Sequence, residues 1–194
     1  MKQLPRFLIF LAAALLPSLA HAHVGAGETK GFFYGMEHPL GGLDHICAMV
    51  AVGLWAAQTG GRSIWIVPLT FVVAMALGGA AGMLGMAGSF VETGIVVSVL
   101  TLGVFIAASV RLPLALSIII VGLFAIFHGQ AHGAEMPETV SGLTYGAGFI
   151  LATAFLHACG IGLGVAIQRF STPAIVRFAD VAIVLCGGYL LLSQ

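Results

Sequence analysis

Six apolar segments constrain the fold of this chain most strongly, because each is close to the length of about 20 residues that a helix needs to cross a bilayer. Charged residues make up only 7% of the 194 residues, against about 25% in an average soluble domain. This composition excludes a water-soluble globule and predicts an all-α integral membrane protein with six transmembrane helices. The predicted spans are residues 39–60, 64–87, 91–110, 113–130, 143–167 and 174–192.

The first 22 residues have the pattern of a secretory signal peptide. Lys2 and Arg6 precede a short apolar run, and residues 20–22 (Ala-His-Ala) carry the small side chains that signal peptidase requires. The run is short for a transmembrane span and Pro17 interrupts it. We predict cleavage after residue 22, so that residues 1–22 are removed and residues 23–194 form one six-helix transmembrane domain.

Charged residues at the ends of the segments predict the orientation of the chain. Basic residues lie at the first, third and fifth connections, and acidic residues lie at the second and fourth. The basic residues are Arg62, Arg111, Arg169 and Arg177, and the acidic residues are Glu92, Glu135 and Glu138. Because short cytoplasmic loops carry an excess of Lys and Arg, we expect the odd connections in the cytoplasm. Together with the signal peptide, this predicts a multi-pass protein of the bacterial inner membrane with a periplasmic mature N-terminus.

Local patterns predict helix ends and close helix contacts. Residues 89–92 (Ser-Phe-Val-Glu) have the capping-box pattern at the start of the third span, and Pro113 suits the first turn of the fourth. Three glycine pairs have the spacing that lets helices approach closely. These pairs are Gly78 and Gly82, Gly142 and Gly146, and Gly160 and Gly164.

Composition also excludes several classes of protein. The net charge is zero and the chain has no basic patch, so a nucleic-acid partner is not expected. The phosphate-binding pattern Gly-x-x-x-x-Gly-Lys is missing from the sequence, which excludes nucleotide hydrolysis by that route. Cys47, Cys159 and Cys186 are odd in number and lie in apolar segments, so they do not suggest a disulfide framework. The expected surroundings are membrane lipids.

The first candidate functional segment, residues 38–45, places His38, Asp44 and His45 where the first span begins. Ionisable groups near a membrane interior are expensive and usually functional. Pro39 suits a first helical position, so a helix is predicted to begin just after His38. In a regular helix, seven residues separate two side chains by about 10 Å, too far to share an ion. A break at the adjacent glycines 41 and 42 would fold the segment back. Asp44 is then either a direct ligand or a group that orients an imidazole.

The second candidate segment ends the fourth span with His128 and His132. Residues four apart lie on one face of a helix, so the two rings are predicted to lie at chelating distance. Glycines at positions 129 and 133 weaken the helix there. Two interfacial histidines bonded to lipid headgroups or backbone are the alternative. Glu135 and Glu138, which follow in the loop, are interpreted as solvated charges, with a role in attracting cations as the alternative.

Three further residues are candidates with weaker support. His157 lies deep in the fifth span, where it is either a core histidine or a second stop for an ion. His23, the predicted mature N-terminus, offers an amine and an imidazole to one ion, although a terminus without a role is equally consistent. Glu37 lies beside His38 and is an additional candidate ligand.

Imidazole and carboxylate groups together suit a borderline divalent transition metal. In a membrane protein they favour a metal carrier, which is not an enzyme. One alternative is an intramembrane metal-dependent hydrolase, but the sequence has no His-Glu-x-x-His motif and Glu37 is its only obvious general base. The other alternative is a sensor or assembly protein that binds metal without moving it.

Two motifs resemble those of a known family. His-Pro-x-x-Gly-x-Asp-His at residues 38–45 and Phe-x-x-x-His-Gly-x-Ala-His-Gly at residues 124–133, after a signal peptide, resemble the HupE/UreJ family over essentially the whole mature chain. The resemblance implies a nickel transporter with six spans that supplies hydrogenase or urease. By position it implies metal handling by His38, Asp44, His45, His128 and His132. It also implies Ni²⁺ as the transported ion, whereas the ligand types alone leave Co²⁺ or Zn²⁺ open as alternatives.

Overall fold

The structure is a computed structural model that describes residues 28–137 and 139–170, with only the backbone of Glu28, Thr29, Asp44 and Phe170. It is all-helical over these residues, without a strand, which confirms the all-α part of the predicted fold class. The helices are α2 (Glu28–Gly41), α3 (Leu43–Thr59), α4 (Ser63–Met83), α5 (Val91–Ala107), α6 (Leu114–Ala134) and α7 (Gly142–Phe170). The predicted signal peptide, His23 and the sixth span at 174–192 lie outside the described residues.

Three of these helices are long and apolar enough to cross a membrane, namely α4, α6 and α7. The bent pair α2 and α3 makes a fourth candidate if it counts as one broken span. Helix α5 is apolar but shorter, at 17 residues. The described part of the chain therefore contains three or four of the six predicted spans.

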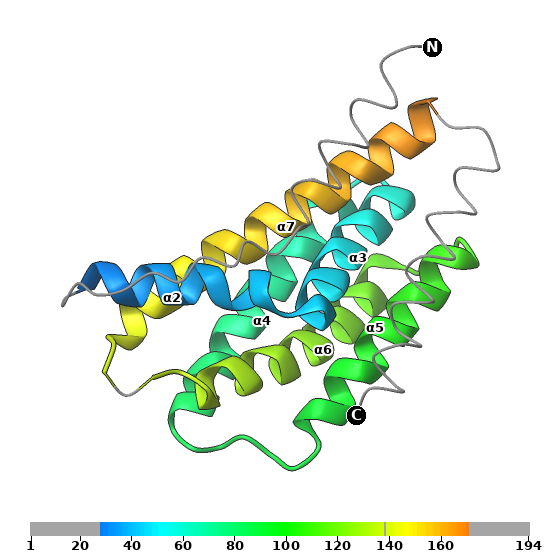
Figure 1. The fold of residues 1–194 in the computed structure, drawn as a ribbon. Helices are drawn as coiled ribbons and strands as arrows, with labels where there is room; N and C mark the ends of the chain where they lie inside the picture. The colour runs from blue at the N-terminus through cyan, green and yellow to red at the C-terminus, as the bar shows by residue number, and fades with distance from the viewer. Residues whose placement is uncertain (1–27, 138, 171–194) are drawn as a thin grey trace.

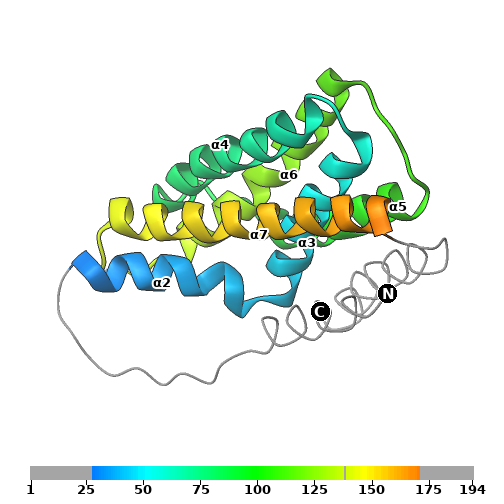
Figure 2. The same cartoon turned by 90° about the horizontal axis from the view of Figure 1, so that it is seen from above.

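The helices form two main packing groups, α4 with α6 and α7 with α2 and α3 (Figure 1). Helix α4 lies along α6, and α7 runs along both α2 and α3, as the view in Figure 2 also shows. Helix α5 packs against α3 and α6. The end of α2, the start of α3 and the end of α6 lie close together, because the rings of His38, His45 and His132 are within 6.5 Å of one another between centroids.

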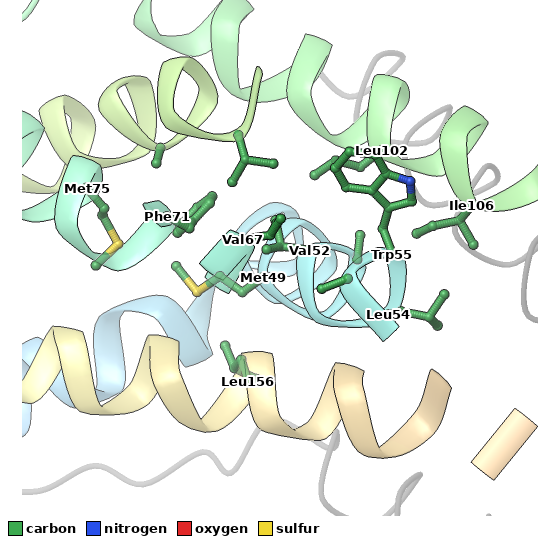
Figure 3. Packing of buried hydrophobic residues seen from close by; sticks show 14 of the residues in the cluster. Met49, Val52, Leu54, Trp55, Val67, Phe71, Met75, Leu102, Ile106 and Leu156 are labelled. Carbon is green, nitrogen blue, oxygen red and sulfur yellow. The ribbon is translucent and has the colours of Figure 1, made fainter. Parts of the chain in front are cut away.

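The interior is filled by apolar side chains from α3 to α7 (Figure 3). Trp55 is fully buried, and its indole N–H donates to the Val110 carbonyl at 2.8 Å, which satisfies the polar group that burial would otherwise leave unpaired. On the outer side of α4, Trp65, Leu69 and Val73 are exposed at four-residue intervals. A stripe of large exposed apolar residues on one helix face fits contact with lipid.

Glycines set the close approach between helices. A side chain at Gly129 or Gly133 of α6 would overlap backbone atoms of α4. On the α4 side, Gly78 and Gly82 are equally close to α6, as predicted from their spacing. The prediction is wrong for Gly146, which has open space around it.

Two predicted helix starts are wrong. Pro39 lies inside α2 and does not begin a helix, because an additional helix, Glu28–Gly41, precedes the predicted span. Helix α5 begins at Val91, and its N-cap is Phe90 without a side-chain bond, so Ser89 forms no capping box with Glu92. Pro113 is the N-cap of α6, one residue before the helix. Cys47 is disulfide-bonded, contrary to the expectation from cysteine number, whereas Cys159 is a free thiol.

Candidate metal centre

The chain breaks at Gly42, between α2 and α3. Gly42 adopts an extended conformation (φ −105°, ψ 123°), and the two helices meet at 78°. The rings of His38 and His45 therefore approach to 6.5 Å between centroids. The predicted break is confirmed, and it brings together two side chains that a regular helix would hold about 10 Å apart.

Three histidines from two helices form what we call the histidine cluster: His45 of α3, and His128 and His132 of α6. One ring nitrogen of each lies within 4.8 Å of the others. The ring of His45 is 5.3 Å from that of His128 and 4.2 Å from that of His132, between centroids. Helix α6 is continuous to Ala134, so the glycines beside the two histidines do not break it. They face α4, and the histidines face α3.

Burial makes the cluster unusual for titratable groups. His128 is 0% and His132 is 2% exposed. Neither ring nitrogen of His132 has a hydrogen-bond partner among the described residues. A buried polar atom without a partner costs about 1–3 kcal/mol, and such atoms in a native fold call for an explanation such as ion binding. The nitrogens of His132 are therefore suited to coordinate a metal.

A second group, the entrance group, consists of His38, His132 and Glu135, whose candidate ligand atoms also lie within 4.8 Å of one another. Nε2 of His38 is 3.0 Å from Oε2 of Glu135. Both residues line a cavity of about 440 Å³ that also contacts His45. Because His132 belongs to both groups, the exposed carboxylate of Glu135 is connected to the buried histidine cluster.

Aromatic side chains surround the two groups. The Phe149 ring of α7 lies 4.3 Å from that of His132, and the Tyr145 ring lies 6.1 Å from that of His38, between centroids. On the inner side, the fully buried Phe71 ring is 5.6 Å from that of His128 and 5.0 Å from that of His157. Phe71 thus lies beside both the cluster and a further histidine.

The structure places His157 of α7 outside both groups. It is 2% exposed, and its Nδ1 lies 2.8 Å from the Met49 carbonyl. A carbonyl only accepts, so Nδ1 carries the proton and Nε2 holds a lone pair. Nε2 has no hydrogen-bond partner among the described residues. Helix α7 comes this close to α3 because Gly53 and Gly160 have no side chains in the contact.

His128 has a polar neighbour that the sequence did not indicate. Ser98 of α5 is fully buried, and its Oγ lies 2.9 Å from Nε2 of His128. Lone serines in apolar helices are common, so only the packing of α5 on α6 identifies this one.

The remaining predicted residues are placed as follows. Asp44 lies in the first turn of α3, and its side chain is not described. Glu37 is exposed on the 440 Å³ cavity but belongs to neither ligand group. Glu135, interpreted as a solvated charge, is exposed, and it also pairs with His38. Its position three residues after His132, on the same side of the helix end, was the available signal. Glu138 and His23 lie outside the described residues.

Comparison with known proteins tests the resemblance. The family described as "HupE / UreJ protein" matches residues 11–190. The chain is a member of the HupE/UreJ family. Protein HupE of Rhizobium leguminosarum bv. viciae is 47% identical over 185 residues, which cover 94% of this chain and 95% of that protein. No solved structure matches the chain. Both histidine-bearing motifs of this HupE/UreJ protein, and all the residues of the two ligand groups, lie inside the matched region.

Proposed function

We propose that the protein is a secondary carrier that takes Ni²⁺ from the periplasm across the bacterial inner membrane. The observation that carries the proposal is the histidine cluster. Three imidazoles converge within 4.8 Å of one another among apolar helices, where ionisable side chains are expensive unless they serve a function. Membership of the HupE/UreJ family supports nickel as the ion and hydrogenase or urease as the recipient.

The ligand set fits an ion that must be released again. Imidazole ligands suit Ni²⁺, Cu²⁺ and Zn²⁺ alike, so the ligands alone do not select nickel, and Co²⁺ and Zn²⁺ are expected competitors. Conduction and transport require binding that is strong enough for entry and weak enough for exit. Three imidazoles, completed by water or by Asp44, meet that requirement better than thiolates.

The order of the ligands defines a path. The ion first meets Glu135 and His38 at the exposed cavity, then passes to the histidine cluster through the shared His132. Beyond the cluster, the Phe71 ring separates His128 from His157, and the bare Nε2 of His157 is the next stop toward the cytoplasm. The membrane potential favours entry of a divalent cation by about 4.6 kcal/mol per 100 mV, twice the value for a single charge.

Uptake of ⁶³Ni²⁺ into proteoliposomes tests the proposal. We expect saturable uptake by the wild type, its loss in His45→Ala and in His128→Ala, and inhibition by excess Co²⁺ or Zn²⁺. Ser117→Ala is the matched control, since Ser117 is a buried α6 residue bonded to the Pro113 carbonyl, far from the cluster in sequence. Uptake of no divalent ion by correctly folded wild type would refute a carrier, and normal uptake by both histidine variants would refute the site.

A further inference from the structure

The one hydroxyl hydrogen of Ser98 decides the state of His128. Its Oγ lies 2.6 Å from the Ile95 carbonyl and 2.9 Å from Nε2 of His128. A carbonyl oxygen can only accept, so the serine hydrogen is directed at Ile95. Toward His128 the serine oxygen must then act as the acceptor. Nε2 of His128 consequently carries the ring proton.

This assignment fixes which nitrogen can bind a metal. A neutral imidazole has one N–H and one lone pair, and the hydrogen bond made by one nitrogen sets the role of the other. With the proton on Nε2, the lone pair is on Nδ1. A metal-binding histidine commonly donates its other N–H to a neighbouring acceptor, which orients the ring and raises its basicity. Ser98 is such an acceptor for the Nε2–H of His128.

We propose that Ser98 is a positioning residue that holds His128 as the Nε2–H tautomer and presents Nδ1 to the transported divalent cation. The inference rests on the proposed function, because it assigns a role within the same histidine cluster. It extends the site to α5, which contributes no side chain to either ligand group. Ser98 is 0% exposed, so water does not substitute readily for its hydroxyl.

Four variants distinguish the effect of the Ser98 hydroxyl group from the effect of side-chain volume. Ser98→Ala and Ser98→Val remove the acceptor, Ser98→Thr keeps it, and Thr and Val have nearly the same shape. Ser117→Ala removes another buried serine hydroxyl that contacts no histidine in the described structure. Ni²⁺ titration of the full chain in detergent, followed by calorimetry, measures affinity. We expect Ser98→Ala and Ser98→Val to weaken binding about tenfold or more, and Ser98→Thr and Ser117→Ala to bind nearly as the wild type does.

Nitrogen NMR of the metal-free protein labelled with ¹⁵N-histidine reads the tautomer directly. The His128 signals are those lost in His128→Asn. We expect Nε2–H in the wild type and in Ser98→Thr, and a mixture of tautomers in Ser98→Val. Wild-type His128 protonated on Nδ1 would overturn the proposal, and this measurement does not depend on any Ser98 variant folding.

The affinity data give an equally clear contrary result. If Nε2 were the ligand, Ser98 would compete with the ion, and Ser98→Ala would bind Ni²⁺ as tightly as the wild type or more tightly. Equal weakening by Thr and Val would also contradict a role for the hydroxyl. Failure of the proposed transport is distinguishable, since it would leave Ni²⁺ binding and its dependence on Ser98 intact while ⁶³Ni²⁺ uptake was lost.

Discussion

In the first histidine-bearing segment the helix breaks between α2 and α3, whereas in the second it runs through α6 without interruption. His38 and His45 are seven residues apart and approach each other only across the 78° bend. His128 and His132 are four apart and share one face of a regular helix. The spacing of the histidines therefore determines whether the backbone must depart from a helix to bring them together.

Glycine serves opposite purposes in the two segments. A Cβ atom at Gly41 would have no neighbour within 4 Å, and the extended conformation of Gly42 is open to any residue, so packing does not require glycine here. These glycines favour the break through their low helix propensity. Gly129 and Gly133 lie inside a continuous helix, where their lack of side chains lets α6 touch the α4 backbone. The first pair weakens the helix at the break, and the second pair allows α6 to pack closely on α4, although both pairs lie beside candidate metal ligands.

The largest expected effect comes from the residue that joins the two segments. His132 of α6 belongs to the histidine cluster and to the entrance group with His38. His132→Ala should abolish saturable ⁶³Ni²⁺ uptake, because it removes a ligand from both groups at once. Membrane abundance and thermal unfolding in detergent should stay close to wild type. Substantial residual uptake would show that the two segments do not act on the same ion.

A substitution on α6 tests the packing role of its glycines. In Gly129→Ala the new methyl group would overlap the Met75 carbonyl and the Gly79 nitrogen of α4. Overpacking of this kind typically costs about 1–3 kcal/mol, so the unfolding temperature in detergent and the uptake should fall together. Gly162→Ala, at an open helical position of α7, is the control and should change neither. A normal unfolding temperature for Gly129→Ala would mean that α4 and α6 are not in close contact.

A substitution at the break should separate uptake from stability. Replacing Gly41 and Gly42 together by alanine raises helix propensity by about 1 kcal/mol per residue and favours one straight helix from α2 into α3. His38 and His45 would then move apart, so we expect a several-fold loss of uptake without a lower unfolding temperature. An equal fall of both quantities would assign these glycines the same packing role as Gly129.

Sequence reasoning was most successful where local chemistry decides the structure. The i, i+4 spacing placed His128 and His132 together, and the adjacent glycines identified the break before His45. Sequence reasoning failed where the contacts of a side chain come from residues far away in the sequence. Nothing near Glu135 in the sequence indicates that His38, 97 residues earlier, lies 3.0 Å away. Ser98 and Phe71 are likewise ordinary residues of apolar helices until α5 and α4 pack against His128. The helix at Glu28–Gly41 was missed because its glycines and charged residues do not form an apolar span.

The fourth prediction concerns the inner end of the path. His157→Ala should lower the maximal rate of uptake, by about tenfold if the residue is a ligand, with little change in the concentration for half-maximal uptake. The reason is that, on the proposed path, the ion enters through the outer histidines and is released toward the cytoplasm through His157. His157→Gln provides a comparison, since its amide can still donate to the Met49 carbonyl. Unchanged kinetics in both variants would make His157 a core residue.

The smallest expected effect distinguishes the two exposed carboxylates at the cavity. Glu135→Gln removes the charge that pairs with His38 on the α6 side, and Glu37→Gln removes a charge on α2 that belongs to neither ligand group. A negative charge at the mouth of a site raises the local cation concentration, and this effect weakens as salt rises. Both variants lose this effect, but only Glu135 also belongs to the entrance group. Glu135→Gln should therefore raise the half-maximal Ni²⁺ concentration a few-fold at low salt and leave the maximal rate nearly unchanged, while Glu37→Gln should raise it less. If the two variants had equal effects, Glu135 would act only through its charge, and the end of α6 would contribute no ligand other than His128 and His132.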